Sequence, residues 1–201
     1  GLLITGKLTA ANSGQNLGSA LTRVVGKGGE PLIRKGVDYA MRLLGKQFVT
    51  GQTIEEALKN GKEREKSGYR FSFDMLGEAA MTQADADRYY QDYVHAIHAI
   101  GKDAAGAGVY EGNGISVKLS AIHPRYVRAQ HERVMAELLP RLRDLFLLAK
   151  QYDIGLNIDA EEANRLELSL DLMEALVSDP DLAGFNGIGF VVQAYQKRCP
   201  F

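Results

Sequence analysis

The sequence contains a single cysteine, Cys199, and no tryptophan. One cysteine cannot form a disulfide within the chain, and the CxxC spacing of zinc and redox sites is absent. We therefore expect neither a structural disulfide nor a cysteine-based metal site. This usage fits a reducing compartment such as the cytoplasm.

Long apolar runs are also missing, since no stretch approaches the roughly 18 apolar residues that a membrane-spanning helix needs. The opening residues GLLITGKL hold only three consecutive large apolar residues and no basic stretch before them. This pattern does not match a signal peptide. Because the chain starts with Gly1 and not with Met, we expect it to begin inside a longer protein.

Charge of one sign is not in excess, because 24 Lys and Arg residues face 25 Asp and Glu residues. Nucleic-acid-binding proteins usually carry a net basic surface. The balance therefore predicts that this segment binds no nucleic acid. The hydrophobic share of 45% is that of an ordinary globular protein, and 201 residues suffice for one substantial core.

The hydrophobic pattern divides the chain into three parts. Residues 1–35, rich in Gly, Ser, Asn and Thr, predict an irregular or helical lead-in. Residues 36–68 predict a helical segment, in which Thr53 and Glu56 form a capping box and Gly68 is a stop signal. Residues 69–201 predict strands alternating with helices. The strands are expected at 69–74, 115–118, 155–159 and 187–193. The helices are expected at 83–105, from Pro124 onward, and at 161–178.

A polar residue closes each of the four expected strands: Asp74, Lys118, Asp159 and Gln193. Their spacing of about 34 to 44 residues is typical of βα units. Residues 69–201 therefore predict an α/β fold, the first four βα units of a truncated (β/α)8 TIM-like barrel preceded by helices. An open doubly wound sheet is the alternative.

The strand-end residues are also the candidate site, because active sites of parallel barrels gather at the carboxyl ends of the strands. Lys118 is the sharpest signal, since it lies between Val117 and Leu119, and a charge there needs a carboxylate or a ligand. Asp74 or Asp159 could supply the carboxylate. A purely structural ion pair, an N-cap role for Asp159 and a strand-end role for Gln193 remain alternatives.

Two histidines, His95 and His98, lie three residues apart on one expected helix. The sequence offers them neither a nearby glutamate base nor a third ligand. We expect no metal site.

Five stretches resemble the proline utilization A family in its proline dehydrogenase half, from about residue 26 to the end. They read EPLIRKGVDYAMRLLGKQFVTGQTIEEAL, YRFSFDMLGEAA, GISVKLSAIHPRY, YDIGLNIDAEEANRLE and GIGFVVQAYQKRCP. The last four contain the strand-end polar residues described above. The resemblance implies a distorted (β/α)8 barrel that holds FAD and oxidises L-proline to pyrroline-5-carboxylate by hydride transfer to the flavin.

The resemblance also implies partners. Electrons pass to membrane quinone, so we expect a cytoplasmic protein associated with the inner membrane face. The other expected partners are L-proline, the remainder of the parent polypeptide and further copies of the protein in a homo-oligomer. Full-length members continue into an NAD-dependent aldehyde dehydrogenase domain, and some carry an N-terminal DNA-binding module. We expect neither part within these 201 residues.

By resemblance, Lys118 pairs with the proline carboxylate and Asp74 borders the substrate. Asp159, the adjoining Ala160, and Gln193 lie beside the flavin, with Lys118 and Asp159 as the catalytic candidates. The family's Arg-Arg pair for the substrate carboxylate is absent, because no two arginines are adjacent here. We therefore expect an incomplete site. The alternatives are an aldolase-type Schiff-base lyase using Lys118, and a scaffold whose strand-end charges are structural.

Overall fold

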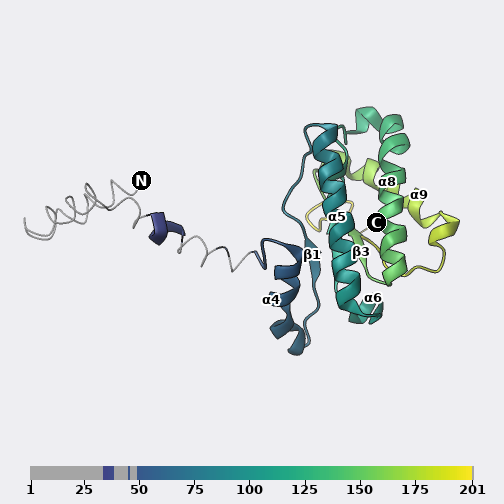
Figure 1. Cartoon of the computed structure of the whole chain (residues 1–201). Coiled ribbons are helices and arrows are strands. Elements are labelled where there is room, and N and C mark those ends of the chain that lie inside the picture. Colours follow the sequence, from purple (N-terminus) through teal and green to yellow (C-terminus); the bar gives the residue numbers. More distant parts are fainter. Residues whose placement is uncertain (1–33, 39–44, 46–48, 201) are drawn as a thin grey trace, which may run out of the picture. The chain divides into compact units, whose positions relative to one another are not determined.

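The computed structural model describes residues 34–38, 45 and 49–200 (Figure 1). The chain divides into two units, residues 1–50 and residues 51–201. In the first unit, residues 34–38 are helical. The expected lead-in over residues 1–35 lies almost entirely outside the described residues, so its structure stays a prediction.

The second unit is built on a parallel sheet with the order β1-β2-β3-β4. The strands are β1 (Ser72–Asp74), β2 (Gly114–Val117), β3 (Leu156–Ile158) and β4 (Ile188–Phe190). A doubly wound sheet reverses its order at a switch point, whereas barrel strands follow one another in sequence. The order confirms the prediction of a parallel α/β fold that corresponds to the first part of a barrel.

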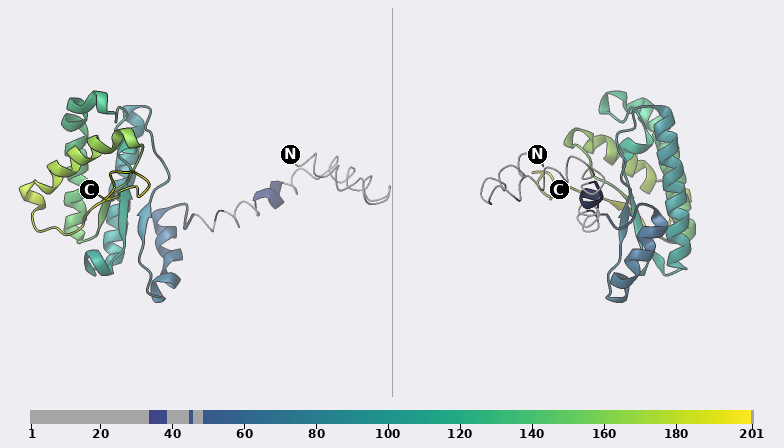
Figure 2. Two further views of the ribbon diagram at one scale, coloured as in Figure 1. Left: turned by 180° about the vertical axis from the view of Figure 1, so that it is seen from behind. Right: turned by 60° about the vertical axis from the view of Figure 1, so that its left-hand side comes forward.

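Helices precede and connect these strands. The longer ones are α4 (Ile54–Lys66), α5 (Gln83–Ala104), α8 (His131–Tyr152) and α9 (Leu166–Val177), and the short ones are α6 (Gly108–Glu111) and α7 (Leu119–Ile122). Helices α5 and α8 run side by side along one face of the sheet (Figure 2). Right-handed βα crossovers place successive helices on the same side, as in a barrel wall. No helix among the described residues is both long and apolar enough to cross a bilayer.

The predicted cap at the start of α4 is confirmed for the Thr53 side chain, whereas the Glu56 carboxylate accepts from the Gln52 N–H and so does not complete the predicted box. The second cap, at the start of α5, was not predicted. The hydroxyl of Thr53 accepts from the Glu56 N–H at 3.2 Å, and α4 ends before Gly68, whose φ is +91°. Thr82 and Asp85 form a reciprocal capping box at the start of α5. These caps satisfy N–H groups that the first turn of a helix leaves without partners.

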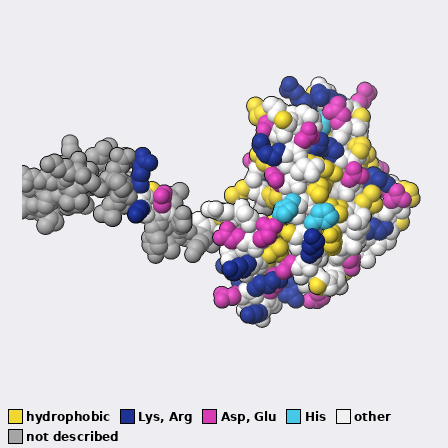
Figure 3. Space-filling model, viewed as in Figure 1, with side chains coloured by type: hydrophobic (Ala, Val, Ile, Leu, Met, Phe, Trp, Pro, Cys, Tyr) yellow, Lys and Arg dark blue, Asp and Glu magenta, His cyan; other side chains and the backbone are white. Residues whose placement is uncertain are grey.

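The core lies between the sheet and the α5–α8 layer. The inward residues of β2 and β3 have no exposed surface: Ile115, Val117, Leu156 and Ile158. The large residues that α5 and α8 direct at them are equally buried: Tyr93, Ile97, Ile100, Leu138, Leu142 and Leu145. On the opposite side of these helices, acidic and basic side chains are interspersed (Figure 3). This amphipathic division explains why periodicity located both helices.

Two helices begin later than predicted. The long helix expected from Pro124 begins at His131, after α7 and a 3-10 turn at Arg128–Gln130. His123 is extended, with φ −151° and ψ 121°, as a residue before proline prefers. The helix expected from residue 161 begins at Leu166, because Glu162 is extended and Ala163–Arg165 forms a 3-10 turn.

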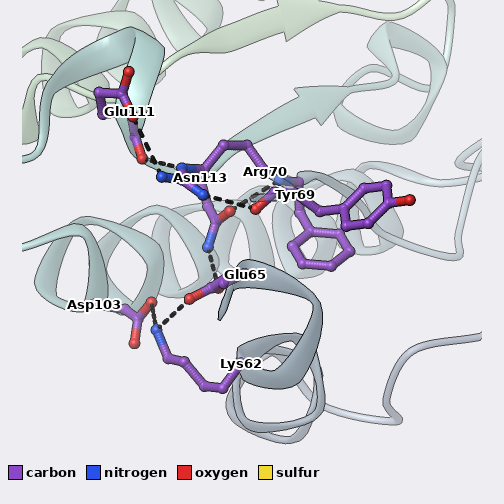
Figure 4. Close-up of polar contacts among 8 residues, drawn as sticks. Lys62, Glu65, Tyr69, Arg70, Asp103, Glu111 and Asn113 are labelled. Atoms are coloured by element: carbon purple, nitrogen blue, oxygen red, sulfur yellow. Dashed lines mark hydrogen bonds and ion pairs between the residues drawn. The ribbon is translucent and has the colours of Figure 1, made fainter. Parts of the chain in front are cut away.

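At the amino edge of the sheet, a polar network joins α4 to the first two strands (Figure 4). Lys62 Nζ lies 2.6 Å from Asp103 Oδ2 and 3.0 Å from Glu65 Oε2. Asn113, which is buried, donates to Glu65 Oε1 at 2.7 Å and accepts from the Phe71 N–H at 2.9 Å. The network satisfies polar groups at the edge opposite the strand-end residues discussed next.

Candidate active site

Three of the predicted strand-end residues form one ion cluster at the carboxyl edge of the sheet. Lys118 Nζ lies 2.5 Å from Asp74 Oδ1 and 2.9 Å from Asp159 Oδ2. The parallel register explains the meeting, because it aligns Asp74 with Ser116 and Val117 with Ile158. Lys118 and Asp159 each follow this last pair and so lie side by side, whereas Asp74 lies on β1 beside Ser116, two positions before Lys118.

The cluster is partly buried and keeps Lys118 charged. The Lys118 side chain is 16% exposed, against 24% for Asp159 and 47% for Asp74. Burial alone would lower the pKa of Lys118, but hydrogen bonds and charge from Asp74 and Asp159 outweigh it and raise that pKa above its usual value. The side chain is therefore an ammonium at physiological pH.

The loops around the cluster are held together by Ser120, two residues after Lys118. Its N–H donates to Glu161 Oε1 at 3.0 Å, and its hydroxyl accepts from the Ala79 N–H at 3.1 Å. Its carbonyl accepts from the Ala80 N–H at 2.8 Å. The loops that follow β1, β2 and β3 are thus joined at one buried residue.

A hollow opens beside Asp159 on the same edge. It is lined by Tyr126, Asp159, Ala160, Glu161, Glu162, Arg165, Leu166, Ser169, Phe190, Val191, Gln193 and Gln196. Asp159, Ala160 and Gln193, the three residues expected beside a flavin, therefore share one lining. Phe190 and Val191 add apolar surface to it.

Gln193 does not close the fourth strand, and this part of the sequence prediction is wrong. Strand β4 ends at Phe190, and Gln193 begins a turn in which the Gln196 N–H donates to the Gln193 carbonyl. The strand-like run GIGFVVQAY misled the prediction, because Val191 and Val192 continue its β-branched character beyond the paired residues. The Gln193 side chain still reaches the hollow from the turn.

The orientation of the Gln193 amide leaves a donor available. Its Oε1 accepts from Gln196 Nε2 at 2.9 Å and from the Tyr195 hydroxyl at 3.3 Å. Within the described part of the chain, its Nε2 has no hydrogen-bond partner. A primary amide has two N–H donors, so both can serve a ligand in the hollow.

The histidines noted in the sequence do not converge on a metal. His95 Nε2 lies 2.7 Å from Glu55 Oε1, while His98 Nδ1 lies 2.8 Å from the Tyr152 hydroxyl. Among residues that the structure describes, no group of three or more His, Cys, Asp and Glu side chains could hold a metal ion.

Sequence reasoning missed two residues that support the cluster. Tyr93 was not among the candidate site residues, yet its hydroxyl accepts from the Lys118 N–H at 3.1 Å. Ser120 was not singled out at all. In the sequence, the signal for Ser120 was its place two residues after Lys118. Helical periodicity shows that Tyr93 lies on the apolar face of its helix, but it does not show which group its hydroxyl contacts.

Comparison with known proteins assigns the part of the chain that contains this edge to a protein family. The family model described as proline dehydrogenase matches residues 57–201. The chain belongs to the proline dehydrogenase family. All three members of the ion cluster and the residues of the hollow lie within the matched range.

A second model, described as the DNA-binding domain of proline dehydrogenase, matches residues 1–48. This match corrects the expectation that no part of a DNA-binding module lies within the 201 residues. The expectation that the segment binds no nucleic acid stays a prediction, and the match does not favour it. A balanced charge over the whole chain says little about a short terminal part.

Curated relatives align over the whole chain. The bifunctional protein PutA of Klebsiella aerogenes is 66% identical over 201 residues, and that of Rhizobium meliloti is 63% identical. Proline dehydrogenase 1 of Bacillus subtilis is 31% identical over 160 residues, which are 80% of this chain and 47% of that protein. The chain spans only 15% to 16% of the length of the two PutA proteins.

Solved structures agree in fold. A mutant of proline utilization A from Bradyrhizobium japonicum matches with a TM-score of 0.70 and 51% identity, over 88% of this chain and 18% of that one. The enzyme from Bdellovibrio bacteriovorus, inactivated by N-propargylglycine, matches with a TM-score of 0.76 and 26% identity, over 84% of this chain and 19% of that one.

Proposed function

We propose that this chain supplies the first part of the barrel of a flavin-dependent proline dehydrogenase, which oxidises L-proline to pyrroline-5-carboxylate with FAD. The observation that carries the proposal is the Lys118 ion cluster beside a hollow that Asp159, Ala160 and Gln193 line. Membership of the family supports proline oxidation and implies a flavin cofactor.

The residues of the hollow fit a flavin. Among the residues that the structure describes, Gln193 Nε2 has no partner and can donate to a ligand. Phe190 and Val191 offer apolar surface, and Ala160 lines the same hollow. When bound, the flavin supplies the redox chemistry as the acceptor of the hydride. Asp159, Ala160 and Gln193 would hold it, and Asp159 would join it to the ion cluster.

Lys118 would bind the substrate carboxylate. A lysine ammonium has three N–H donors, and contacts to Asp74 and Asp159 use two of them. The third is available to an oxygen of the substrate. Holding that end of proline fixes the distance and angle of the reacting carbon, which is the main contribution of a positioning group.

The cluster cannot neutralise a carboxylate by itself. Two aspartates outnumber one lysine, so an incoming anion meets net negative charge unless another cation is near. The resemblance assigns that role to an Arg-Arg pair, and the present sequence has no adjacent arginines. We infer that a further part of the enzyme supplies the second cation.

The remaining partners belong to the same proposal and rest on the resemblance and the PutA relatives. They are membrane quinone as the electron acceptor, the rest of the parent polypeptide with an NAD-dependent aldehyde dehydrogenase domain, and further copies of the enzyme in a homo-oligomer. The proposed location is the cytoplasm, at the inner face of the membrane.

The Schiff-base alternative is not favoured. Imine formation needs a neutral lysine amine, whereas the raised pKa of Lys118 keeps it protonated between two carboxylates. Enzymes that form imines desolvate the lysine or place it near another cation. Lys118 is desolvated, but its two carboxylate partners outweigh that burial, and they place anions and not another cation beside it.

The test is Lys118→Ala in the full-length enzyme, with flavin absorbance recorded to show that the cofactor is retained. We expect binding of cyclopentanecarboxylate, a ring analogue that has no amine to oxidise, to weaken by about 2 to 5 kcal/mol. Binding of cyclopentanecarboxamide should weaken much less. Lys62→Ala is the matched control, because Lys62 is also paired with two carboxylates but at the opposite edge. Equal losses for both ligands would assign Lys118 to the flavin or to folding.

A further inference from the structure

Tyr93 connects the middle of helix α5 to the end of strand β2. Its side chain is fully buried between the helix and the sheet. Its hydroxyl accepts a hydrogen bond from the backbone N–H of Lys118 at 3.1 Å. A side chain of the outer helix layer therefore reaches the residue that carries the ammonium of the ion cluster.

The Lys118 N–H is placed where the sheet no longer provides a partner. The last paired residue of β2 is Val117, whose carbonyl accepts from the Asp159 N–H at 2.9 Å. Lys118 is still extended, with φ −89° and ψ 119°, and α7 begins at the next residue. A buried N–H without an acceptor costs free energy comparable to a lost hydrogen bond. The Tyr93 hydroxyl removes that cost and fixes this peptide.

The hydroxyl does so without adding charge to the cluster. Burial is the largest influence and raises the pKa of Tyr93 to about 12, and the charges of Asp74 and Asp159 act in the same direction. The phenol is therefore neutral over the physiological range.

We infer that Tyr93 is a positioning residue for substrate recognition, which acts by fixing the backbone from which the Lys118 side chain reaches the substrate carboxylate. This inference rests on the proposed function, because it needs Lys118 to bind a carboxylate. A free Lys118 peptide would let the ammonium move relative to Asp74 and Asp159. The contact to the ligand depends on that position more than the stability of the fold does.

The experiment compares Tyr93→Phe with Tyr90→Phe in the full-length flavoenzyme. Tyr90 lies one turn earlier on α5, where its ring packs under the Arg141 guanidinium at 4.7 Å, and its hydroxyl forms no hydrogen bond among the described residues. Tyr93→Phe should raise the inhibition constant of cyclopentanecarboxylate about fivefold to tenfold, the size expected for one lost hydrogen bond. The inhibition constant of cyclopentanecarboxamide should change less than about twofold on the same reasoning. Tyr90→Phe should change neither.

A merely structural role for Tyr93 would weaken both ligands alike or only lower the unfolding temperature, and either result overturns the inference. Should Tyr93→Phe not fold with flavin, 4-aminophenylalanine at position 93 keeps the ring and a polar group but is a poorer acceptor. It should give the same selective loss, and equal binding of carboxylate by this variant and the wild type also overturns the inference.

Lys118→Ala separates failure of the inference on Tyr93 from failure of the proposed function. If Lys118→Ala selectively weakens the carboxylate and Tyr93→Phe does not, only the inference on Tyr93 fails, whereas no selectivity in Lys118→Ala removes the proposed function of the cluster itself.

Discussion

At the scale of single residues, the ion cluster combines two demands that usually conflict. A lysine at the end of a buried strand needs negative charge to offset its desolvation. A site for an anionic substrate needs positive charge left over. Lys118 meets the first demand with Asp74 and Asp159. In the proposed site the second demand is met only in part, because the cluster is net negative and Lys118 offers the substrate carboxylate one remaining N–H donor. Such a site discriminates by geometry more than by net attraction.

Gln193 offers a prediction on the cofactor side of the site. An amide that donates to the flavin stabilises the negative charge that reduction adds to the ring. Gln193→Ala removes this donor, so we expect the midpoint potential of the full-length enzyme to fall by some tens of millivolts. The estimate takes one hydrogen bond as roughly 1 to 3 kcal/mol and 30 mV as about 1.4 kcal/mol for two electrons.

Potentiometric titration of the flavin absorbance measures this shift, beside the inhibition constant of cyclopentanecarboxylate. Tyr195→Phe is the control, since it removes only a partner of the Gln193 side chain at 3.3 Å. An unchanged potential with strongly weakened inhibitor binding would place Gln193 with the substrate and not with the flavin.

The residues of the cluster were visible in the sequence, because a charged side chain interrupts an apolar strand. Lys118, Asp74 and Asp159 were identified in this way, and the structure brings all three together. Tyr93 was not, since a tyrosine on the apolar side of a helix looks like packing. Its hydroxyl gains a partner only through the distance between α5 and the end of β2, which no local pattern encodes.

At the scale of helices and strands, α5 and α8 approach closely where Gly101 faces Tyr152. A Cβ at position 101 would overlap the Tyr152 ring, so the ring or the helix would have to shift. We expect Gly101→Ala to destabilise the unit by about 1 to 3 kcal/mol, as overpacking does in other cores. The gain in helix propensity of about 1 kcal/mol offsets part of this cost.

The thermal unfolding midpoint checks this expectation. Gly155→Ala is the matched control, because a Cβ there meets only Val109 Cγ1 at 3.8 Å, an ordinary contact. Equal midpoints for Gly101→Ala and the wild type would show that the α5–α8 layer adjusts freely.

The turn between α7 and α8 contains a buried histidine whose protonation opposes folding. His123 Nδ1 accepts from the Arg125 N–H at 3.2 Å, and Nε2 lies 3.2 Å from Glu137 Oε2. Burial lowers the pKa of His123 and outweighs the opposing effect of Glu137. A lowered folded-state pKa contributes stability that is present above the unfolded value of 6.5 and is lost as the pH falls through the folded value.

We therefore expect stability to decline between about pH 7 and pH 5 more steeply in the wild type than in His123→Asn. The asparagine carbonyl can replace Nδ1 as the acceptor for Arg125, and it does not titrate. Denaturation midpoints measured across this pH range give the slope of stability against pH for each protein. Comparing the slopes removes any difference in stability that does not depend on pH. Parallel slopes would mean that His123 titrates alike in the folded and unfolded states.

Helix and strand types were predictable here, but several boundaries were not. Periodicity located α5 and α8, because each presents one apolar face to the sheet. The start of α8 was misplaced by seven residues, from Pro124 to His131, because proline is favoured at a helix start and also favours an extended residue before it. The end of β4 was misplaced because β-branched residues continue past the last sheet partner.

At the scale of the whole second unit, the four strands form a sheet whose two edge strands, β1 and β4, each pair on one side only among the described residues. Strand β4 pairs with β3 and, within the described residues, with no further strand. Several apolar side chains near the carboxyl edge are exposed: Leu76, Met81, Val192 and Tyr195. The sequence predicted the barrel-like order because its strand spacing repeats, whereas the extent of the exposed surface follows only from the three-dimensional arrangement.

An open parallel edge beside exposed apolar residues favours pairing with another chain. We expect the isolated 201-residue chain to self-associate as its concentration rises, which sedimentation velocity measures directly.

Val192→Lys should weaken the association, because Val192 is 53% exposed next to the end of β4 and a lysine there would place charge at the edge. Val177→Lys is the control, since Val177 is 56% exposed at the end of α9 and away from the strand. A wild-type chain that stays monomeric throughout, or equal effects of the two lysines, would show that the edge of β4 does not direct association. Selective relief by Val192→Lys would assign the association to the edge of β4.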